Sequence, residues 1–215
     1  MMRSEGAFLP AAGLDLLLPL YDPFTRLLGF DRVRQALVEQ AGLDPYMRVL
    51  DVGCGTGTLA VLIKRLYPSI DVVAIDPDAH ALARARRKAD RAQVFVRFDL
   101  GFASALGYRQ ASFDRVFSSM MFHHLERDEQ AQALREIARV LRPGGRLAFL
   151  DFAGPDSRAH GTFGRLLHSH RRLSGNSAAR VLDLMAAAGL QQAMQIREQA
   201  TIVGRVAFYQ ASAPS

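Results

Sequence analysis

The sequence predicts an α/β fold: a doubly wound, mostly parallel β-sheet that ends in an antiparallel hairpin. Short apolar runs alternate with helix-patterned segments from residue 45 onward, as expected of parallel strands joined by helices. A glycine-rich turn, Gly53–Gly57, lies between the first apolar run and the first of these helices, where open α/β sheets bind ligands. The last two strand-like runs, 191–198 and 201–210, are too close in sequence for a parallel crossover. They must therefore pair antiparallel or not at all.

Each element has its own local signal. Residues 12–42 predict one or two helices that end at Gly42, and Asp78 is placed to start a later helix. The other predicted elements are, in order, strand 48–51, helix 58–67 ended by Pro68, strand 71–75, helix 78–90, strand 94–98, strand 114–117, helix 127–141 ended by 143–145, strand 146–150, helices 160–173 and 177–188 with Gly189 as C-terminal cap, and the two final strands.

Length and composition predict one domain of 215 residues with 49% hydrophobic and 22% charged residues. We divide it into an N-terminal helical cap (1–42), a ligand-binding core (45–152), and substrate-side helices with the hairpin (153–215). No apolar run approaches the ~20 residues that span a bilayer. The apolar N-terminus is interrupted by Pro10 and Asp15 and is interpreted as a cap rather than a signal peptide, so a cytoplasmic location is expected.

The chain carries a net charge of +6, which raises the question of an anionic partner. Basic residues gather in two predicted helical segments, 84–91 and 165–172, without the interleaved aromatic residues of a base-stacking surface. We therefore expect solvated helix faces and no nucleic-acid partner. For the second segment a lipid head-group or membrane-surface role stays open.

The glycine turn separates two kinds of nucleotide site. A dinucleotide fingerprint has glycines at positions one, three and six, whereas here they occupy one, three and five (Gly53, Gly55 and Gly57), with Thr58 at six. Asp76, at the end of the second strand, can accept hydrogen bonds from both hydroxyls of an adenosine ribose, which suits either NAD or S-adenosylmethionine. The single cysteine, Cys54, is interpreted as a small residue that fills the turn, and it excludes a cysteine-cluster metal site.

The pattern D-x-G-x-G-x-G at 51–57 resembles motif I of class I S-adenosylmethionine-dependent methyltransferases. The segments F-D-x-V…H-H-L (113–125) and R-V-L-x-P-G-G-x-L (139–147) resemble the small-molecule branch of that family, which includes ubiquinone and menaquinone methyltransferases. The resemblance covers about residues 45–152. It implies a Rossmann-like seven-stranded sheet, S-adenosyl-L-methionine as cofactor with S-adenosyl-L-homocysteine as product, and a small-molecule acceptor.

The resemblance also implies roles for individual residues. Asp99 would accept a hydrogen bond from the adenine amino group. The backbone N–H of the next residue, Leu100, would donate to a nitrogen of the adenine ring. The segment 101–108 departs from the family's usual form. A tyrosine near the N-terminus, Tyr21, would meet the methionine carboxylate, with Arg26 in the same segment. The predicted cofactor-binding set is Tyr21, Asp51, Gly53, Cys54, Gly55, Gly57, Asp76, Pro77, Asp99, Leu100 and Ser118.

Methyl transfer is an in-line displacement, so catalysis needs alignment and, for a phenol, hydroxyl or acidic carbon, a base. His123 and His124 follow the fourth strand and are candidate catalytic residues; the alternative is that one packs at this junction. His160, His168 and His170 are secondary candidates, and no carboxylates stand at metal-ligand spacing, so no metal is expected.

The resulting hypothesis is methyl transfer to O, C or N of a small molecule, with an aromatic or quinone-like acceptor favoured by the apolar cap and by Met120–Phe122. A phospholipid head-group N-methyltransferase and a cofactor-binding protein without catalysis are the alternatives. We expect a monomer or homodimer without a transmembrane segment, and leave peripheral membrane contact open.

Overall fold

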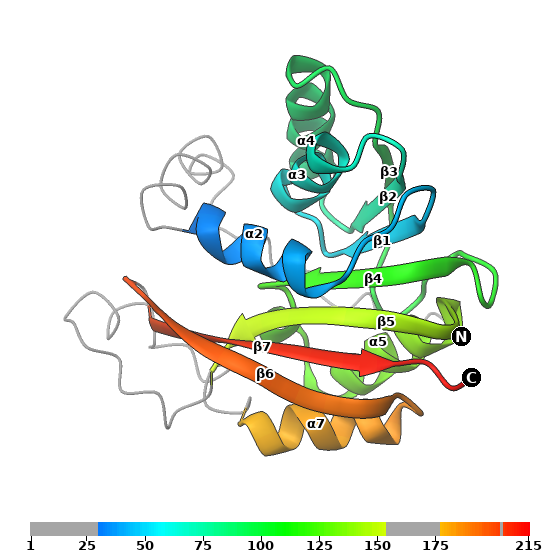
Figure 1. Ribbon diagram of the computed structural model, residues 1–215, viewed down its shortest axis with the longest axis vertical. Coiled ribbons are helices and arrows are strands. Elements are labelled where there is room, and N and C mark those ends of the chain that lie inside the picture. The colour runs from blue at the N-terminus through cyan, green and yellow to red at the C-terminus, as the bar shows by residue number, and fades with distance from the viewer. Residues whose placement is uncertain (1–29, 154–176, 203) are drawn as a thin grey trace, which may run out of the picture.

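The computed structural model describes residues 30–153, 177–202 and 204–215, which form a seven-stranded sheet with helices on both faces (Figure 1). The strand order is β3-β2-β1-β4-β5-β7-β6. The strands are β1 (Arg48–Val52), β2 (Asp71–Asp76), β3 (Arg97–Leu100), β4 (Phe113–Ser119), β5 (Leu141–Phe152), β6 (Gln191–Thr201) and β7 (Gly204–Ser212). Strands β1 to β5 are parallel, and β7 runs antiparallel to both β5 and β6. The predicted fold class is confirmed.

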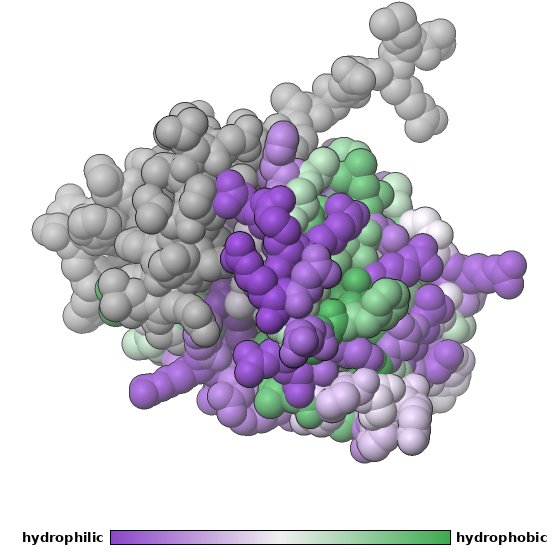
Figure 2. Space-filling model, turned by 90° about the horizontal axis from the view of Figure 1, so that it is seen from above, coloured by the Kyte–Doolittle hydropathy of each residue, from purple (hydrophilic) through white to green (hydrophobic). Residues whose placement is uncertain are grey.

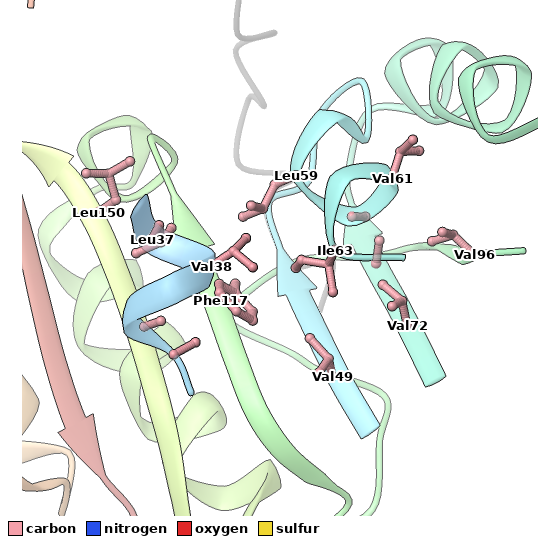
Figure 3. Packing of buried hydrophobic residues seen from close by; sticks show 14 of the residues in the cluster. Leu37, Val38, Val49, Leu59, Val61, Ile63, Val72, Val96, Phe117 and Leu150 are labelled. Atoms are coloured by element: carbon pink, nitrogen blue, oxygen red, sulfur yellow. The ribbon is translucent and has the colours of Figure 1, made fainter. Parts of the chain in front are cut away.

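The helices divide between the two faces of the sheet. They are α2 (Phe30–Gln40), α3 (Thr58–Leu66), α4 (Ala79–Arg91), α5 (Arg127–Val140) and α7 (Ala178–Ala187), with a 3-10 turn, η2 (Phe122–His124), after β4. Helices α2, α3 and α4 cover one face and build a core with alternate strand residues, for which Figure 3 shows Leu37 and Ile63 above Val49 and Phe117. Helices α5 and α7 cover the other face with a second core. A sheet buried on both faces explains the continuous apolar runs in the sequence.

Caps at the helix ends agree with the sequence. The Asp78 side chain accepts hydrogen bonds from the backbone N–H groups of His80 and Ala81, which fixes the start of α4. Gly189 ends α7 with a φ of +87°, as expected of a C-terminal cap glycine. The predicted helix 160–173 lies outside the described residues.

Several strand boundaries were predicted wrongly. The last strand begins at Gly204 rather than at 201, because Thr201 belongs to β6 and pairs with Gly204. β3 spans Arg97–Leu100 rather than 94–98, because the Val94 N–H still bonds to the Ala89 carbonyl at the end of α4. β5 begins at Leu141 rather than at 146, so the Pro-Gly-Gly turn lies within the strand. Phe113 pairs with Leu141 and Arg115 already pairs with Arg146, so the turn forms an irregularity in the ladder between these two pairs.

The parallel strands bring the predicted site residues to one edge. Asp51 lies opposite Ala74 and Asp99 opposite Ile75, while Ser118 lies opposite Val52. The carboxyl ends of β1 to β5 therefore meet along the same edge of the sheet, where ligands bind in open α/β folds.

Candidate functional site

The three glycines of the loop after β1 have positive φ angles but different surroundings. A Cβ on Gly53 would lie 2.2 Å from Met121 Cγ, and one on Gly57 would lie 2.7 Å from Ala85 Cβ. A Cβ on Gly55 would meet nothing within 4 Å. Gly53 and Gly57 are therefore required by packing, and Gly55 presents bare backbone to open space, as expected of the residue that a ligand approaches.

Asp76 ties the glycine loop to the end of β2. Its Oδ2 accepts the Gly55 N–H at 2.7 Å and its Oδ1 accepts the Asp78 N–H at 2.9 Å. Burial raises the pKa of Asp76, and these two N–H groups oppose the increase. The carboxylate thus shapes the open side of the loop, and each oxygen keeps one further lone pair as an acceptor.

Asp51 is a buried carboxylate with an unmet hydrogen-bonding demand. Within the described part of the chain, Asp51 Oδ2 and Ser118 Oγ are buried atoms without a hydrogen-bond partner. Burial is the main cause that raises the pKa of Asp51 from 3.8 to about 7, followed by the charge of Asp76, with the Ala60 N–H and Arg34 acting in the opposite direction. Buried polar groups in folded proteins are nearly always satisfied. An orphaned acceptor at a ligand edge indicates that a donor, and preferably a cation, completes it.

Asp51 and Ser118 do not point to the same side of the sheet. Asp51 lies opposite Ala74, which belongs to the core under α2, α3 and α4, whereas Ser118 lies opposite Val52, which belongs to the other core. A single ligand group at the strand edge is therefore not expected to hydrogen-bond to both Asp51 Oδ2 and Ser118 Oγ. Of the two, Asp51 has the greater need of a partner because its carboxyl group can be charged.

Asp99 is held by a residue that sequence reasoning missed. The Tyr108 hydroxyl donates to Asp99 Oδ2 at 2.9 Å, and Arg97 Nε donates to Asp99 Oδ1 at 3.0 Å. Burial, the hydrogen bond to Asp99 and its charge raise the pKa of Tyr108, so the phenol stays protonated and remains a donor. Two apolar side chains that follow Asp99 in the chain, Leu100 and Phe102, are 64% and 52% exposed.

The segment that carries Tyr108 is fixed from α5. The Arg139 guanidinium donates to the carbonyls of Leu106 and Tyr108, each at 2.8 Å, and the Glu136 carboxylate accepts the Leu106 N–H at 2.8 Å. Arg139 and Glu136 also pair with each other at 2.7 Å. The segment 101–108 is thus anchored by Arg139, the arginine of the R-V-L-x-P-G-G segment. Its departure from the family pattern was the only sign in the sequence that a residue such as Tyr108 could contact Asp99.

Two further members of the predicted set fill the loop region. Cys54 is partly buried, and burial raises the pKa of its thiol well above the ordinary value, so it is not a reactive thiolate. Pro77 is half-buried between Asp76 and the helix cap Asp78. The partial burial of Cys54 agrees with its interpretation as a residue that fills the turn, and Pro77 stays a predicted cofactor-binding residue.

His123 forms a close pair with a second residue that sequence reasoning missed. Its Nδ1 lies 2.6 Å from Oδ1 of Asp151, and its backbone N–H donates to Asp151 Oδ2 at 2.9 Å. The His124 and Phe152 rings pack on the His123 ring, with centroids 4.1 and 5.0 Å away. A signal for Asp151 was present, because it is an aspartate at the carboxyl end of a buried strand, like Asp51.

Tyr21, Arg26, His160, His168 and His170 lie outside the described residues. Across residues 30–153, 177–202 and 204–215, no group of three or more histidine, cysteine or acidic side chains is arranged to hold a metal ion. No helix in the same residues combines the length and apolarity needed to cross a membrane.

The basic segment on α4 has partly structural duties. Figure 2 views the molecule from the side of α4, where hydrophilic residues predominate. Lys88 donates to the hydroxyls of Thr58 and Thr56, at 2.6 and 3.1 Å, and Arg86 donates to the Phe98 carbonyl at 2.9 Å. Lys88 and Arg86 thus stabilise the glycine loop and β3, so part of the positive charge of α4 has a structural role.

The sheet order, the antiparallel hairpin and the glycine loop with its edge aspartates define a class I methyltransferase. A model of the methyltransferase domain matches residues 49–145. The chain is 38% identical to the demethylmenaquinone methyltransferase of Deinococcus radiodurans over 75% of this chain and 70% of that one, and 39% identical to that of Thermus thermophilus over 66% of each. The chain belongs to the family of S-adenosylmethionine-dependent methyltransferases that includes these two enzymes.

Solved structures agree on the fold. The YcgJ protein of Bacillus subtilis superposes with a TM-score of 0.72 at 20% identity, covering 86% of this chain and 99% of that one. A [4+2]-cyclase, SpnF, superposes with a TM-score of 0.70 at 22% identity, covering 86% and 80%. At these identities the likeness concerns the fold alone.

Proposed function

We propose that the edge described above binds S-adenosylmethionine through residues that fit its parts. The orphaned Asp51 carboxylate suits the ammonium group, the bare backbone at Gly55 suits close approach of the ligand, and Asp76 keeps lone pairs for the ribose hydroxyls. Asp99 and the exposed Leu100 suit an adenine ring with its amino group. The single observation that carries this proposal is the buried, unpartnered Oδ2 of Asp51. When bound, the cofactor supplies a methyl group on a positively charged sulfur.

We propose an aromatic, quinol-like small molecule as the acceptor. Two relatives that share more than a third of their aligned residues with this chain are named demethylmenaquinone methyltransferases, and another relative, 38% identical over 62% of this chain, is a 27-O-demethylrifamycin SV methyltransferase. Apolar and aromatic side chains border the candidate base: Met121 beside the glycine loop and Phe152 against the His123 ring. Such a border favours a flat apolar acceptor over a charged head group.

Methyl transfer can be tested directly. The purified chain is incubated with S-adenosylmethionine carrying a tritiated methyl group and either chemically reduced demethylmenaquinone or phosphatidylethanolamine vesicles. We expect label in the naphthoquinol alone. Label only in the phospholipid would overturn the quinol acceptor. Failure to label either, with S-adenosylhomocysteine binding intact, would favour the cofactor-binding protein without catalysis.

We propose a cytoplasmic enzyme with one methyltransferase domain, a monomer or homodimer, that has no nucleic-acid partner. Size-exclusion chromatography with light scattering would determine the oligomeric state, and a filter-binding assay with duplex DNA and RNA should show no retention.

A further inference from the structure

We infer that His123 and Asp151 form a catalytic dyad in which His123 is the general base and Asp151 its positioning residue, and that the dyad selects an acceptor with an ionisable hydroxyl group, a phenol or hydroquinone. The inference rests on the proposed function, because it concerns the acceptor side of the same site. Asp151 belongs to none of the sequence motifs that marked the cofactor site.

The geometry fixes the orientation of the imidazole. Asp151 is fully buried, and its carboxylate accepts three hydrogen bonds: from the ring and the backbone of His123 and from the backbone of Phe152 at 2.7 Å. Because one carboxylate holds both the ring and the main chain of His123, the ring has little freedom to turn. Contacts with the His124 and Phe152 rings restrict it further.

The same contact determines which ring nitrogen is available. An ionised carboxylate only accepts hydrogen bonds, so Nδ1 of His123 must carry the hydrogen and Nε2 of the neutral ring must be the acceptor. Across the described residues, His123 is the one ion-pair partner that Asp151 has. An imidazole whose Nδ1 faces a buried carboxylate and whose Nε2 is left as the proton acceptor has the arrangement of a histidine base oriented by a carboxylate.

The dyad is placed where an acceptor can reach it. η2 follows directly after Met121, whose side chain packs on Gly53 of the cofactor loop. The His123 side chain keeps 12% of its surface exposed, whereas that of Asp151 keeps 1%. Part of the His123 side chain thus reaches the surface, whereas the Asp151 side chain is sealed from solvent.

The acceptor class follows from what a base is needed for. A neutral amine already offers a lone pair, whereas a phenol becomes a strong nucleophile only when its O–H proton leaves. Nε2 of His123 takes this proton. The electron pair left on the acceptor forms the bond to the methyl carbon, at oxygen or at an adjacent ring carbon that then loses its own hydrogen as a proton. The pair of the broken carbon–sulfur bond remains on sulfur, which becomes a neutral thioether, and His123 returns its proton to water.

The test combines a spectroscopic and a kinetic readout. Histidine-labelled protein is studied by NMR with bound S-adenosylhomocysteine to identify the His123 tautomer in the wild type and in Asp151→Asn. Turnover is measured with naphthohydroquinone and with its more acidic cyano derivative for the wild type, Asp151→Asn and His123→Gln. Asp71→Asn, at the opposite edge of the sheet, is the matched control for loss of a carboxylate.

We expect the Nδ1–H tautomer in the wild type and its loss in Asp151→Asn. We expect kcat to fall about 10²- to 10⁴-fold in both dyad variants, with a smaller loss for the cyano derivative, while KM and affinity for S-adenosylhomocysteine change little. An Nε2–H tautomer in the wild type, or equal losses with both acceptors, would overturn the dyad. If the wild type methylates neither hydroquinone, the acceptor proposal fails, and the tautomer still decides whether Asp151 positions His123.

Discussion

Replacing Asp51 by Asn should stabilise the protein without ligand and weaken the binding of its cofactor. The pKa of Asp51 is raised from 3.8 to about 7, chiefly by burial. A group whose pKa is higher in the folded state stabilises that state at low pH, and this contribution is lost as the pH rises through the folded value. The shift of about three units corresponds to about 4 kcal/mol when the carboxylate is fully ionised.

The contribution of Asp51 to the unfolding free energy can be measured by comparing the pH dependence of stability in the wild type and in Asp51→Asn. Between pH 5 and pH 8 the wild type should lose about 2–3 kcal/mol more unfolding free energy than Asp51→Asn, because only the wild type must ionise a buried group. Urea unfolding at several pH values measures this difference. Asp71→Asn, which removes an exposed carboxylate at the other edge, controls for a general effect of charge. Parallel pH curves for wild type and Asp51→Asn would refute the reasoning.

Binding supplies the second half of this prediction. S-adenosylhomocysteine carries the same ammonium group, so its affinity for the wild type should rise as the pH increases through about 7. Asp51→Asn should bind it about 10- to 100-fold more weakly at pH 8, as expected for loss of a charge-assisted hydrogen bond. Calorimetry at each pH measures both effects. Unchanged affinity in the variant would remove Asp51 from the site.

Three further substitutions test the other parts of this edge of the sheet. Tyr108→Phe removes the hydroxyl that donates to Asp99 and should weaken the binding of S-adenosylhomocysteine about 5- to 10-fold. Binding of the inosine analogue, which lacks the adenine amino group, should hardly change. Equal losses of affinity for both ligands in calorimetry would contradict a role of Asp99 in recognising that amino group. Gly53→Ala should lower the melting temperature strongly, because its Cβ would lie 2.2 Å from Met121 Cγ. Gly55→Ala should cost only about 1–2 kcal/mol of left-handed backbone strain yet abolish ligand binding; wild-type binding would show that the ligand does not approach Gly55.

The fold was predictable because its signals are local and repeated. An apolar strand, a cap residue such as Asp78 and a terminal glycine such as Gly189 each determine a boundary within a few residues. The errors arose where a boundary depends on contacts with other elements: β3 begins late because the Val94 N–H bonds to Ala89 at the end of α4, and β5 begins early because Leu141 pairs with Phe113 across an irregular ladder. Neighbouring elements impose these boundaries, and the sequence of the strand alone does not contain them.

The sequence predicted those parts of the candidate site that lie within one continuous segment. It missed residues that reach the site from a different segment. The loop around Gly55 is contiguous in the chain. Asp151 lies 28 residues from His123, and Tyr108 lies in a segment without a family pattern. The first contact becomes apparent only when β4 is placed beside β5, and the second only when α5 anchors the segment 101–108 through Glu136 and Arg139.

Four parallel strands carry an aspartate at or next to their carboxyl ends, and how each aspartate is satisfied separates their roles. Asp76 accepts backbone N–H groups of the loop, Asp99 accepts from Tyr108 and Asp151 accepts from His123. Asp51 alone of the four has a buried oxygen without a partner in the described residues. The charge of Asp76 opposes the ionisation of Asp51, so a cation that binds at this edge gains most beside Asp51, whose Oδ2 has no donor in the described residues. We therefore propose that the unpartnered Asp51 oxygen is completed by the ligand and that Asp151, paired with His123, serves the chemistry.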